Sequence, residues 1–216
     1  MESSHLFGGK MQTKIVKIDP AQIDESKMEE AAKLIREGEL VAFPTETVYG
    51  LGADALHPEA SKKLYAAKGR PSDNPLIVHI CRFEELESIA REVPPQAKKL
   101  AEAFWPGPLT MIVWKNDRVP YETTGGMETV AIRMPNHPVA LKLIEESGCL
   151  IAAPSANTSG KPSPTEAAHV ALDLDGKIPM ILDGGPVGIC IESTIIDLTR
   201  KKTVILRPGY ITEKMI

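Results

Sequence analysis

Two patterns of apolar and polar positions alternate along this chain, and they predict different elements. Short apolar runs bounded by Pro, Gly or polar residues indicate strands, and they lie at 15–18, 40–43, 76–80, 109–114, 130–133, 150–153, 180–182, 194–198 and 204–206. Apolar positions three and four residues apart indicate helices, and these lie at 25–37, 58–67, 83–91, 95–104, 137–147 and 164–174. In the first helix one face carries Met28, Ala31, Ala32, Leu34 and Ile35.

This alternation predicts an α/β fold with helices flanking one twisted sheet. Strands follow one another late in the chain without a helix between them, so we expect both parallel and antiparallel neighbours. No linker, internal repeat or low-complexity tract divides the sequence. We therefore expect a single domain over residues 13–210, preceded by a disordered extension or tag at 1–12 and followed by a tail at 211–216.

The composition is that of an ordinary globular protein, with 43% hydrophobic and 25% charged residues among 216. A net charge of −4 argues against binding nucleic acid through a general coat of cations, so any basic groove is expected to be local. Cys81, Cys149 and Cys190 form no CxxC pair, and their apolar surroundings predict reduced core thiols in a cytoplasmic protein. No apolar run approaches the roughly 18 residues that span a bilayer, so no membrane contact is expected.

Several common catalytic motifs are missing from the sequence. Gly160-Lys161 is followed by proline and forms no GxxxxGK[ST] loop, and Gly50-Leu51-Gly52 lacks the third glycine of a dinucleotide fingerprint. The five histidines show no metal-ligand spacing, and there is no GxSxG elbow. A nucleotide site in this chain has to be of another type.

A short loop carries two cations between a predicted helix and a predicted strand. Lys68 and Arg70 flank Gly69, which allows a tight turn or the close approach of a ligand, and Pro71 and Pro75 stiffen the rest of the loop. A lysine point charge beside an arginine fork suits the binding of phosphate oxygens. Two ordinary surface charges on a solvated loop remain the alternative.

Polar residues also follow other predicted strands, where ligands of open α/β sheets tend to bind. The first group is Thr45-Glu46-Thr47, within a run that ends in Gly50-Leu51-Gly52, and the second is the hydroxyl- and amide-rich loop 155–160. Arg133, Ser193 and Arg207 lie at the ends of further strands. Each group taken alone is also explained as a turn with capping side chains or as a surface charge.

In combination these segments are far more specific. PTETVYGL (44–51), KGR (68–70), WPGPLT (105–110), RMP (133–135), SAN (155–157) and STI (193–195) follow in this order, with Pro75-Leu76 and His79 between them. From about residue 14 to 209 the chain resembles the YrdC-type threonylcarbamoyl-AMP synthase family. The resemblance implies a twisted α/β sheet around one concave, locally positive cavity. It implies synthesis of threonylcarbamoyl-AMP and pyrophosphate from L-threonine, bicarbonate or CO2 and ATP.

The resemblance also implies roles for particular residues. Lys68 and Arg70 are the expected catalytic residues, gripping the phosphates. The expected ATP-binding set is Lys68, Arg70, Asn74, Ser155, Asn157, Ser163 and Arg207. The expected L-threonine-binding set is Thr47, His79, Arg133, Ala153 and Ser193. Mg²⁺ is expected with ATP, held by phosphates and water and not by protein ligands. Tyr49 is expected to line the cavity, and Glu46 either orients the amine or the metal or is structural.

The same resemblance implies further partners and leaves alternatives open. A downstream transferase complex is expected to pass the threonylcarbamoyl group to tRNA. One branch of the family carries a linker and a second domain, so this chain is either the short type or a fragment of the long one. An RNA-binding module without turnover, with contact to tRNA or double-stranded RNA, remains an alternative. A domain that uses carbamoyl phosphate to form carbamoyl-adenylate is another.

Overall fold

The structure, a computed structural model, describes residues 11–216. Residues 1–10 of the predicted extension lie outside this range. Within it, ten strands form one sheet in the order β1-β8-β2-β3-β7-β4-β6-β5-β9-β10. The strands are β1 (Lys14–Lys17), β2 (Val41–Pro44), β3 (Tyr49–Asp54), β4 (Ile77–His79), β5 (Leu109–Trp114), β6 (Thr129–Arg133), β7 (Ile151–Ala152), β8 (Met180–Asp183), β9 (Thr194–Asp197) and β10 (Val204–Arg207). Parallel and antiparallel pairs are mixed, which confirms the predicted fold class.

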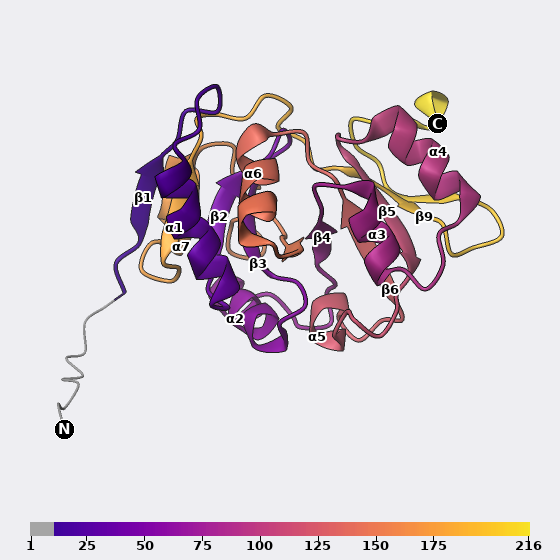
Figure 1. The fold of residues 1–216 in the computed structure, drawn as a ribbon, viewed down its shortest axis with the longest axis horizontal. Helices are drawn as coiled ribbons and strands as arrows, with labels where there is room; N and C mark the ends of the chain where they lie inside the picture. Colours follow the sequence, from indigo (N-terminus) through magenta and orange to yellow (C-terminus); the bar gives the residue numbers. More distant parts are fainter. Residues whose placement is uncertain (1–10) are drawn as a thin grey trace.

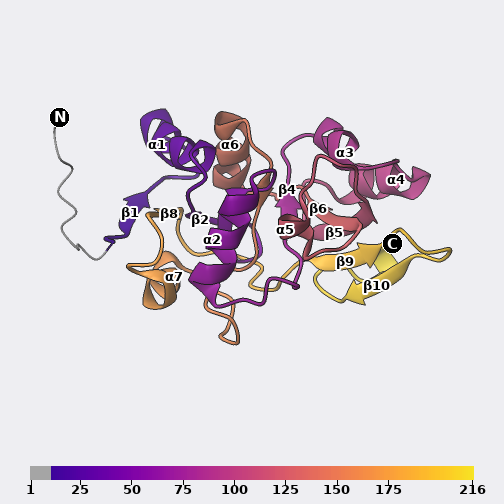
Figure 2. The ribbon, with the colours of Figure 1, turned by 90° about the horizontal axis from the view of Figure 1, so that it is seen from below.

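Helices cover both faces of the sheet. They are α1 (Glu25–Arg36), α2 (Pro58–Lys68), α3 (Phe83–Ile89), α4 (Pro95–Phe104), α5 (Tyr121–Thr124), α6 (Pro138–Ser147) and α7 (Ala167–Leu174), with a 3-10 turn η1 (Glu213–Met215) near the end. In Figures 1 and 2, α1, α6, α3 and α4 lie on one face, and α2 and α7 lie on the other beneath the β1–β3 half. No described helix is long and apolar enough to cross a membrane.

Two hydrophobic cores hold these layers together. The apolar face predicted for the first helix packs as expected, because Met28, Ala31, Ala32 and Ile35 are buried with Phe43 of β2 in the core beneath α1 and α6. Asp24 caps the start of this helix by accepting hydrogen bonds from the backbone N–H groups of residues 26 and 27. A larger core packs beneath α2 and α7 on the other face, and it is continuous with the side chains buried beneath α3 and α4.

Three sequence-based expectations need correction. The segment 45–52, interpreted as a strand end followed by a turn, contains β3, which pairs antiparallel with β2 from Val41↔Gly52 to Pro44↔Tyr49. The short helix α5 was not predicted, and the helix expected from 164 begins at Ala167. Cys81 and Cys149 are partly buried, but Cys190 is exposed, so the prediction of a core thiol is wrong there.

The close packing of β2, β3 and β7 explains the second glycine of the Gly50-Leu51-Gly52 segment. A Cβ at Gly52 would lie 2.7 Å from Phe43 Cε1 and 2.8 Å from Ile151 Cγ2, both in the core. Glycine is therefore required at this position by packing between neighbouring strands.

We expect Gly52→Ala to lower the free energy of unfolding by about 1–3 kcal/mol, because the methyl group overpacks a filled core. Chemical denaturation of the purified variant measures this. Gly188→Ala is the matched control, since a Cβ there meets nothing within 4 Å and should leave stability within about 0.5 kcal/mol. Equal stability of the two variants would contradict the packing argument.

Candidate active site

A cavity of about 290 Å³ opens on the sheet face that α2 and α7 leave uncovered, beside β4, β6, β5 and β9. Its apolar floor includes Ile77, Ala131 and Ile112, which are lateral neighbours in the strand register. Its polar wall comes from the segments 45–50, 70–75, 153–155, 192–193 and 206–207. Residues from both ends of the chain therefore meet at one place.

The register of three strands places polar side chains in a row across this face. His79 of β4 pairs with Arg133 of β6, and Arg133 pairs with Thr110 of β5. Each lies two residues from a floor position, and side chains two apart on a strand point to the same side. The apolar strands therefore carry a buried polar row into the cavity.

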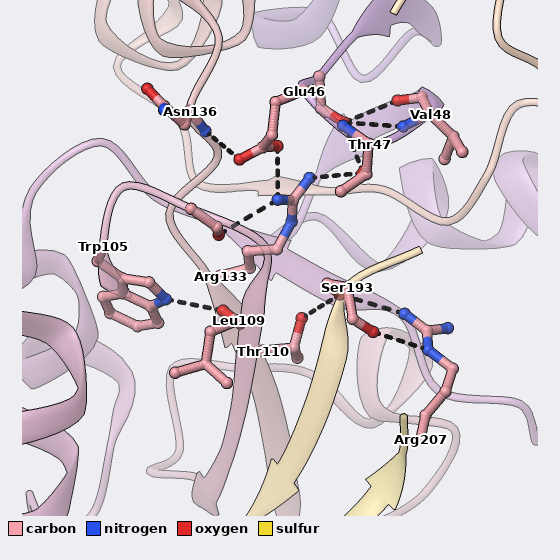
Figure 3. A network of polar contacts seen from close by, with 12 residues as sticks. Glu46, Thr47, Val48, Trp105, Leu109, Thr110, Arg133, Asn136, Ser193 and Arg207 are labelled. Atoms are coloured by element: carbon pink, nitrogen blue, oxygen red, sulfur yellow. Dashed lines mark hydrogen bonds and ion pairs between the residues drawn. The ribbon is translucent and has the colours of Figure 1, made fainter. Parts of the chain in front are cut away.

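Arg133 is the most constrained member of this row. Its Nη1 donates to Glu46 Oε1 at 2.7 Å and to the Gly107 carbonyl at 3.3 Å, and its Nη2 donates to Thr47 Oγ1 at 3.2 Å (Figure 3). A guanidinium has five N–H donors, so among the described residues these bonds leave the Nε–H and one Nη2–H for a ligand. Burial lowers the pKa of Arg133, and the carboxylate of Glu46 opposes that effect.

Glu46 connects the segments that surround Arg133. Its Oε2 accepts a hydrogen bond from the backbone N–H of Asn136 at 2.7 Å, and its own carbonyl accepts one from Ile189 at 3.2 Å. The side chain thereby joins the β2–β3 loop to the end of β6. This geometry favours the structural interpretation of Glu46 over a role in orienting a metal.

The β2–β3 loop is shaped by its own hydroxyl groups. Thr45 Oγ1 donates to the Val48 carbonyl at 2.7 Å and accepts from the backbone N–H of Thr47 at 3.2 Å. This local pattern fixes a tight turn. It leaves Thr47 facing both Arg133 and the cavity.

His79 is buried beside Arg133 and is neutral at physiological pH. Burial, together with the nearby Arg133 cation, lowers the pKa of His79 to about 3. Its Nδ1 lies 3.0 Å from the Ile77 carbonyl. A neutral imidazole at this position can offer a hydrogen bond without adding a second positive charge to Arg133.

A second arginine network borders the polar row, because its Ser193 lies next to Thr110. Arg207 Nε donates to the Ser193 carbonyl at 2.9 Å, its Nη2 to Ser193 Oγ at 3.1 Å and its Nη1 to Glu192 Oε2 at 2.9 Å. Ser193 Oγ also lies 2.7 Å from Thr110 Oγ1. Figure 3 shows this network below the one around Arg133. Both Ser193 and Arg207 are held in place before any ligand arrives.

The Lys68-Gly69-Arg70 segment follows directly from the end of α2. Gly69 takes the left-handed conformation that ends the helix, with φ of +60°. Lys68 is 2% exposed and donates to the Ser155 carbonyl, whereas Arg70 lines the cavity and donates to the Pro75 carbonyl at 2.9 Å. Burial, reinforced by the Arg70 charge, lowers the pKa of Lys68 to about 8.

The 155–163 loop borders the cavity, but only its first residue is exposed to it. Ser155 lines the cavity. Asn157 Nδ2 donates to the carbonyls of Thr158 and Lys161 at 2.8 and 2.9 Å, and its buried Oδ1 has no partner among the described residues. Ser163 donates to Glu192 Oε1 at 3.1 Å. A buried acceptor without a donor costs free energy, so Asn157 is suited to receive one from a ligand or water.

The structure brings the predicted site residues together. Nine of them line the cavity, namely Thr47, Arg70, Asn74, His79, Arg133, Ala153, Ser155, Ser193 and Arg207. Lys68 and Ser163 do not line the cavity but donate to residues that do, Ser155 and Glu192. Asn157 is buried further back, and its bonds go to Thr158 and Lys161, which do not line the cavity. The expectation for Tyr49 is wrong, because its ring is buried in the core and its hydroxyl donates to the Gly185 carbonyl at 2.6 Å.

Three polar residues of the site have no role among the predicted ATP and threonine ligands. Thr45 and Glu192 line the cavity, and Thr110 holds Ser193. The sequence places Thr45 in the polar group that follows a strand but assigns it no ligand, and the only signal for Glu192 is that it precedes Ser193. The position of Thr110 depends on strand register, which short strands do not specify in the sequence.

The arrangement can bind anions at two places within one cavity. Arg70 and Arg207 present charge and N–H donors at one wall, with the Lys68 charge behind them, and Arg133 presents two free donors at the other. The described residues contain no group of three or more His, Cys, Asp or Glu side chains that could hold a metal ion.

Comparisons with known proteins agree with this geometry. The sequence model of the Sua5/YciO/YrdC family, described as "Telomere recombination", matches residues 33–209. The threonylcarbamoyl-AMP synthase of Pyrococcus abyssi is 61% identical over 188 residues, which cover 87% of this chain and 55% of that protein. The threonylcarbamoyl-AMP synthase of Bacillus subtilis is 57% identical, covering 92% of this chain and 58% of that protein. The chain thus spans a little over half the length of these relatives.

Comparison with solved structures also identifies a similar protein. The crystal structure of P. abyssi Sua5 complexed with L-threonine superposes with a TM-score of 0.92 at 58% sequence identity, covering 94% of this chain and 61% of that chain. Fold, sequence identity and family match cover the same region, which includes the whole cavity. This chain belongs to the Sua5/YciO/YrdC family.

Proposed function

We propose that this chain forms threonylcarbamoyl-AMP and pyrophosphate from L-threonine, bicarbonate or CO2 and ATP. The observation that carries the proposal is the buried Arg133, with two N–H donors left for a ligand, in one cavity with Arg70 and Arg207. Two relatives at 57–61% identity are named threonylcarbamoyl-AMP synthase. A solved relative at 58% identity is complexed with L-threonine.

In the proposed complex, the amino acid binds at the polar row. The threonine carboxylate takes the free Nε–H and Nη2–H of Arg133, because a guanidinium edge matches a carboxylate in a two-bond geometry. Thr47, His79 and Ser193, together with the Ala153 carbonyl, surround the remaining amine and hydroxyl. The amine then lies over the middle of the cavity, toward the opposite wall.

ATP binds at the more cationic wall. Arg70 and Arg207 meet the phosphates directly, with Asn74 and Ser155 beside them. Lys68 and Ser163 lie immediately behind, bonded to the lining residues Ser155 and Glu192, and complete the phosphate-binding set. Asn157 joins this set through a water, because its free Oδ1 accepts hydrogen bonds and phosphate oxygens do not donate them. Mg²⁺ fits this site as a companion of the triphosphate, because Glu192 is the one carboxylate among the described residues that line the cavity. Such an ion supplies charge neutralisation for the phosphates.

The proposed chemistry needs positioning and no covalent enzyme intermediate. The threonine nitrogen bonds to the carbon of CO2 and loses a proton, giving a carbamate. A carbamate oxygen then bonds to the α-phosphorus of ATP while the bond from that phosphorus to the pyrophosphate oxygen breaks. Fixed N–H donors stabilise the charge that develops on the phosphoryl oxygens. We further propose that a transferase complex passes the threonylcarbamoyl group on to tRNA.

Pyrophosphate release from ATP tests the proposal directly. We expect release that requires L-threonine and bicarbonate together, and that falls to the background rate when either is omitted or when another amino acid replaces threonine. The measurement is a coupled pyrophosphate assay on the purified chain. Binding of RNA with no ATP turnover and no threonine binding would overturn the proposal in favour of an RNA-binding module.

The low pKa of Lys68 predicts how ATP affinity depends on pH. The protonated amine attracts phosphate, and bound phosphate raises its pKa above the value of about 8 in the free protein. Affinity for ATP should therefore fall by up to about tenfold per pH unit above pH 8. Lys68→Arg should remove this fall, because arginine stays charged throughout the range. Calorimetry between about pH 7 and pH 10 measures it, and a flat wild-type profile would contradict the assignment.

Arg133→Ala should act on the amino acid and not on ATP. We expect the threonine KM to rise by about 30-fold or more, because charge-assisted hydrogen bonds to the carboxylate are lost, while the ATP KM changes little. Steady-state kinetics with each substrate varied measures both. Arg91→Ala, at an exposed arginine 3.8 Å from Glu128, is the matched control. An unchanged threonine KM in Arg133→Ala would remove this residue from the site.

A further inference from the structure

Arg133 alone does not explain why phosphate groups stay away from the amino-acid wall of the cavity. A guanidinium edge binds carboxylates and phosphates with the same two-bond geometry. The cavity must receive a polyanion and a zwitterion together, and both carry groups that fit an arginine. The geometry of the arginine therefore does not decide whether a carboxylate or a phosphate binds at a given wall. Another property of the site has to distinguish the two ligands.

The two walls differ in their net charge. At the nucleotide wall, Lys68, Arg70 and Arg207 are opposed by the carboxylate of Glu192, which leaves a net charge of +2. The Asp173 carboxylate also acts on Lys68, but it is paired with Lys161 and does not change this balance. The Glu192–Arg207 pair is also the more exposed one, with side-chain exposures of 39% and 33%. This wall therefore keeps a positive field for a polyanion.

At the amino-acid wall the charges cancel. Arg133 and Glu46 are 3% and 12% exposed and 2.7 Å apart, so their opposite charges are paired away from water. The neighbouring His79 is neutral. This wall has two directed N–H donors and no net charge, which matches an amino-acid zwitterion, whose own net charge is also zero. A phosphate brought here would carry an uncompensated negative charge into a poorly hydrated place.

We propose that Glu46 is a specificity-determining residue that excludes phosphate groups from the amino-acid wall by neutralising Arg133. The hydrogen bond from Arg133 to Glu46 fixes the orientation of the guanidinium, so that its free N–H groups point in set directions. The negative charge of Glu46 cancels the positive charge of Arg133 and so removes its general attraction for anions. The inference rests on the proposed function and adds to it the reason why the two substrates do not exchange places. Specificity of this kind comes from an element that disfavours the wrong ligand.

Competition between pyrophosphate and L-threonine tests the role of Glu46. In the wild-type protein, saturating pyrophosphate should change the calorimetric Kd of L-threonine by less than about twofold, because the two bind at different walls. In Glu46→Gln, which keeps the shape and loses the charge, pyrophosphate should also reach Arg133 and weaken threonine binding about tenfold or more. Independence of the two ligands in a Glu46→Gln variant that still binds threonine would overturn the inference.

Glu192→Gln is the matched control, since it makes the same chemical change in the other arginine–glutamate pair. Pyrophosphate should then bind more tightly, while threonine binding remains independent of it. Competition of the same size in both variants would mean that overall charge matters and that the position of Glu46 does not. Wild-type protein that binds neither ligand would instead overturn the proposed function itself.

A substrate analogue extends the test to the wild-type protein and does not depend on the variant folding. The phosphonate analogue of L-threonine keeps the amine and the hydroxyl but adds negative charge where the carboxylate was. We expect the wild-type protein to bind it at least about tenfold more weakly than L-threonine. Equal affinity for the two compounds would overturn the inference. In a folded Glu46→Gln variant the difference should shrink.

Discussion

The buried ion pair between Arg133 and Glu46 is the interaction on which the amino-acid wall of the cavity depends. It joins the end of β6 to the β2–β3 loop, and through the Asn136 backbone it also fixes the segment that leads to α6. Burying a single charge is costly, and a buried pair is tolerated only where further hydrogen bonds satisfy it. Thr47 and the Gly107 carbonyl provide those bonds, so neighbouring segments are ordered by the same requirement.

Much of the fold could be predicted because its strands and helices have strong apolar patterns. Strand β5 and the buried face of α1 are examples, since both keep one pattern over several residues. Strand β3 was missed because Gly50 and Gly52 lower the strand signal, and its burial between β2 and β7 compensates for their weak propensity. The four-residue α5 is too short to show a helical period.

The cationic residues of the site could be predicted from the sequence, but the residues that bind to them could not. Lys68, Arg70, Arg133 and Arg207 could be chosen because cations beside strand ends are chemically informative. Their partners could not, because the bond from Arg133 to Glu46 spans 87 positions and depends on the register of several strands. Cys190 shows the same limit, since apolar neighbours in sequence did not indicate its exposure in a loop with positive φ.

The strand order also bears on how this chain can fold during its synthesis. β8 lies between β1 and β2 and pairs with both in parallel, although more than a hundred residues separate it from them in the sequence. At the other side, β9 adds to β5 and carries Ser193 to the cavity. Contacts this distant in sequence form late and slowly. During synthesis the β8-facing edges of β1 and β2 therefore stay unpaired until residues 180–183 have been made, and unpaired strand edges are exposed to association with other chains.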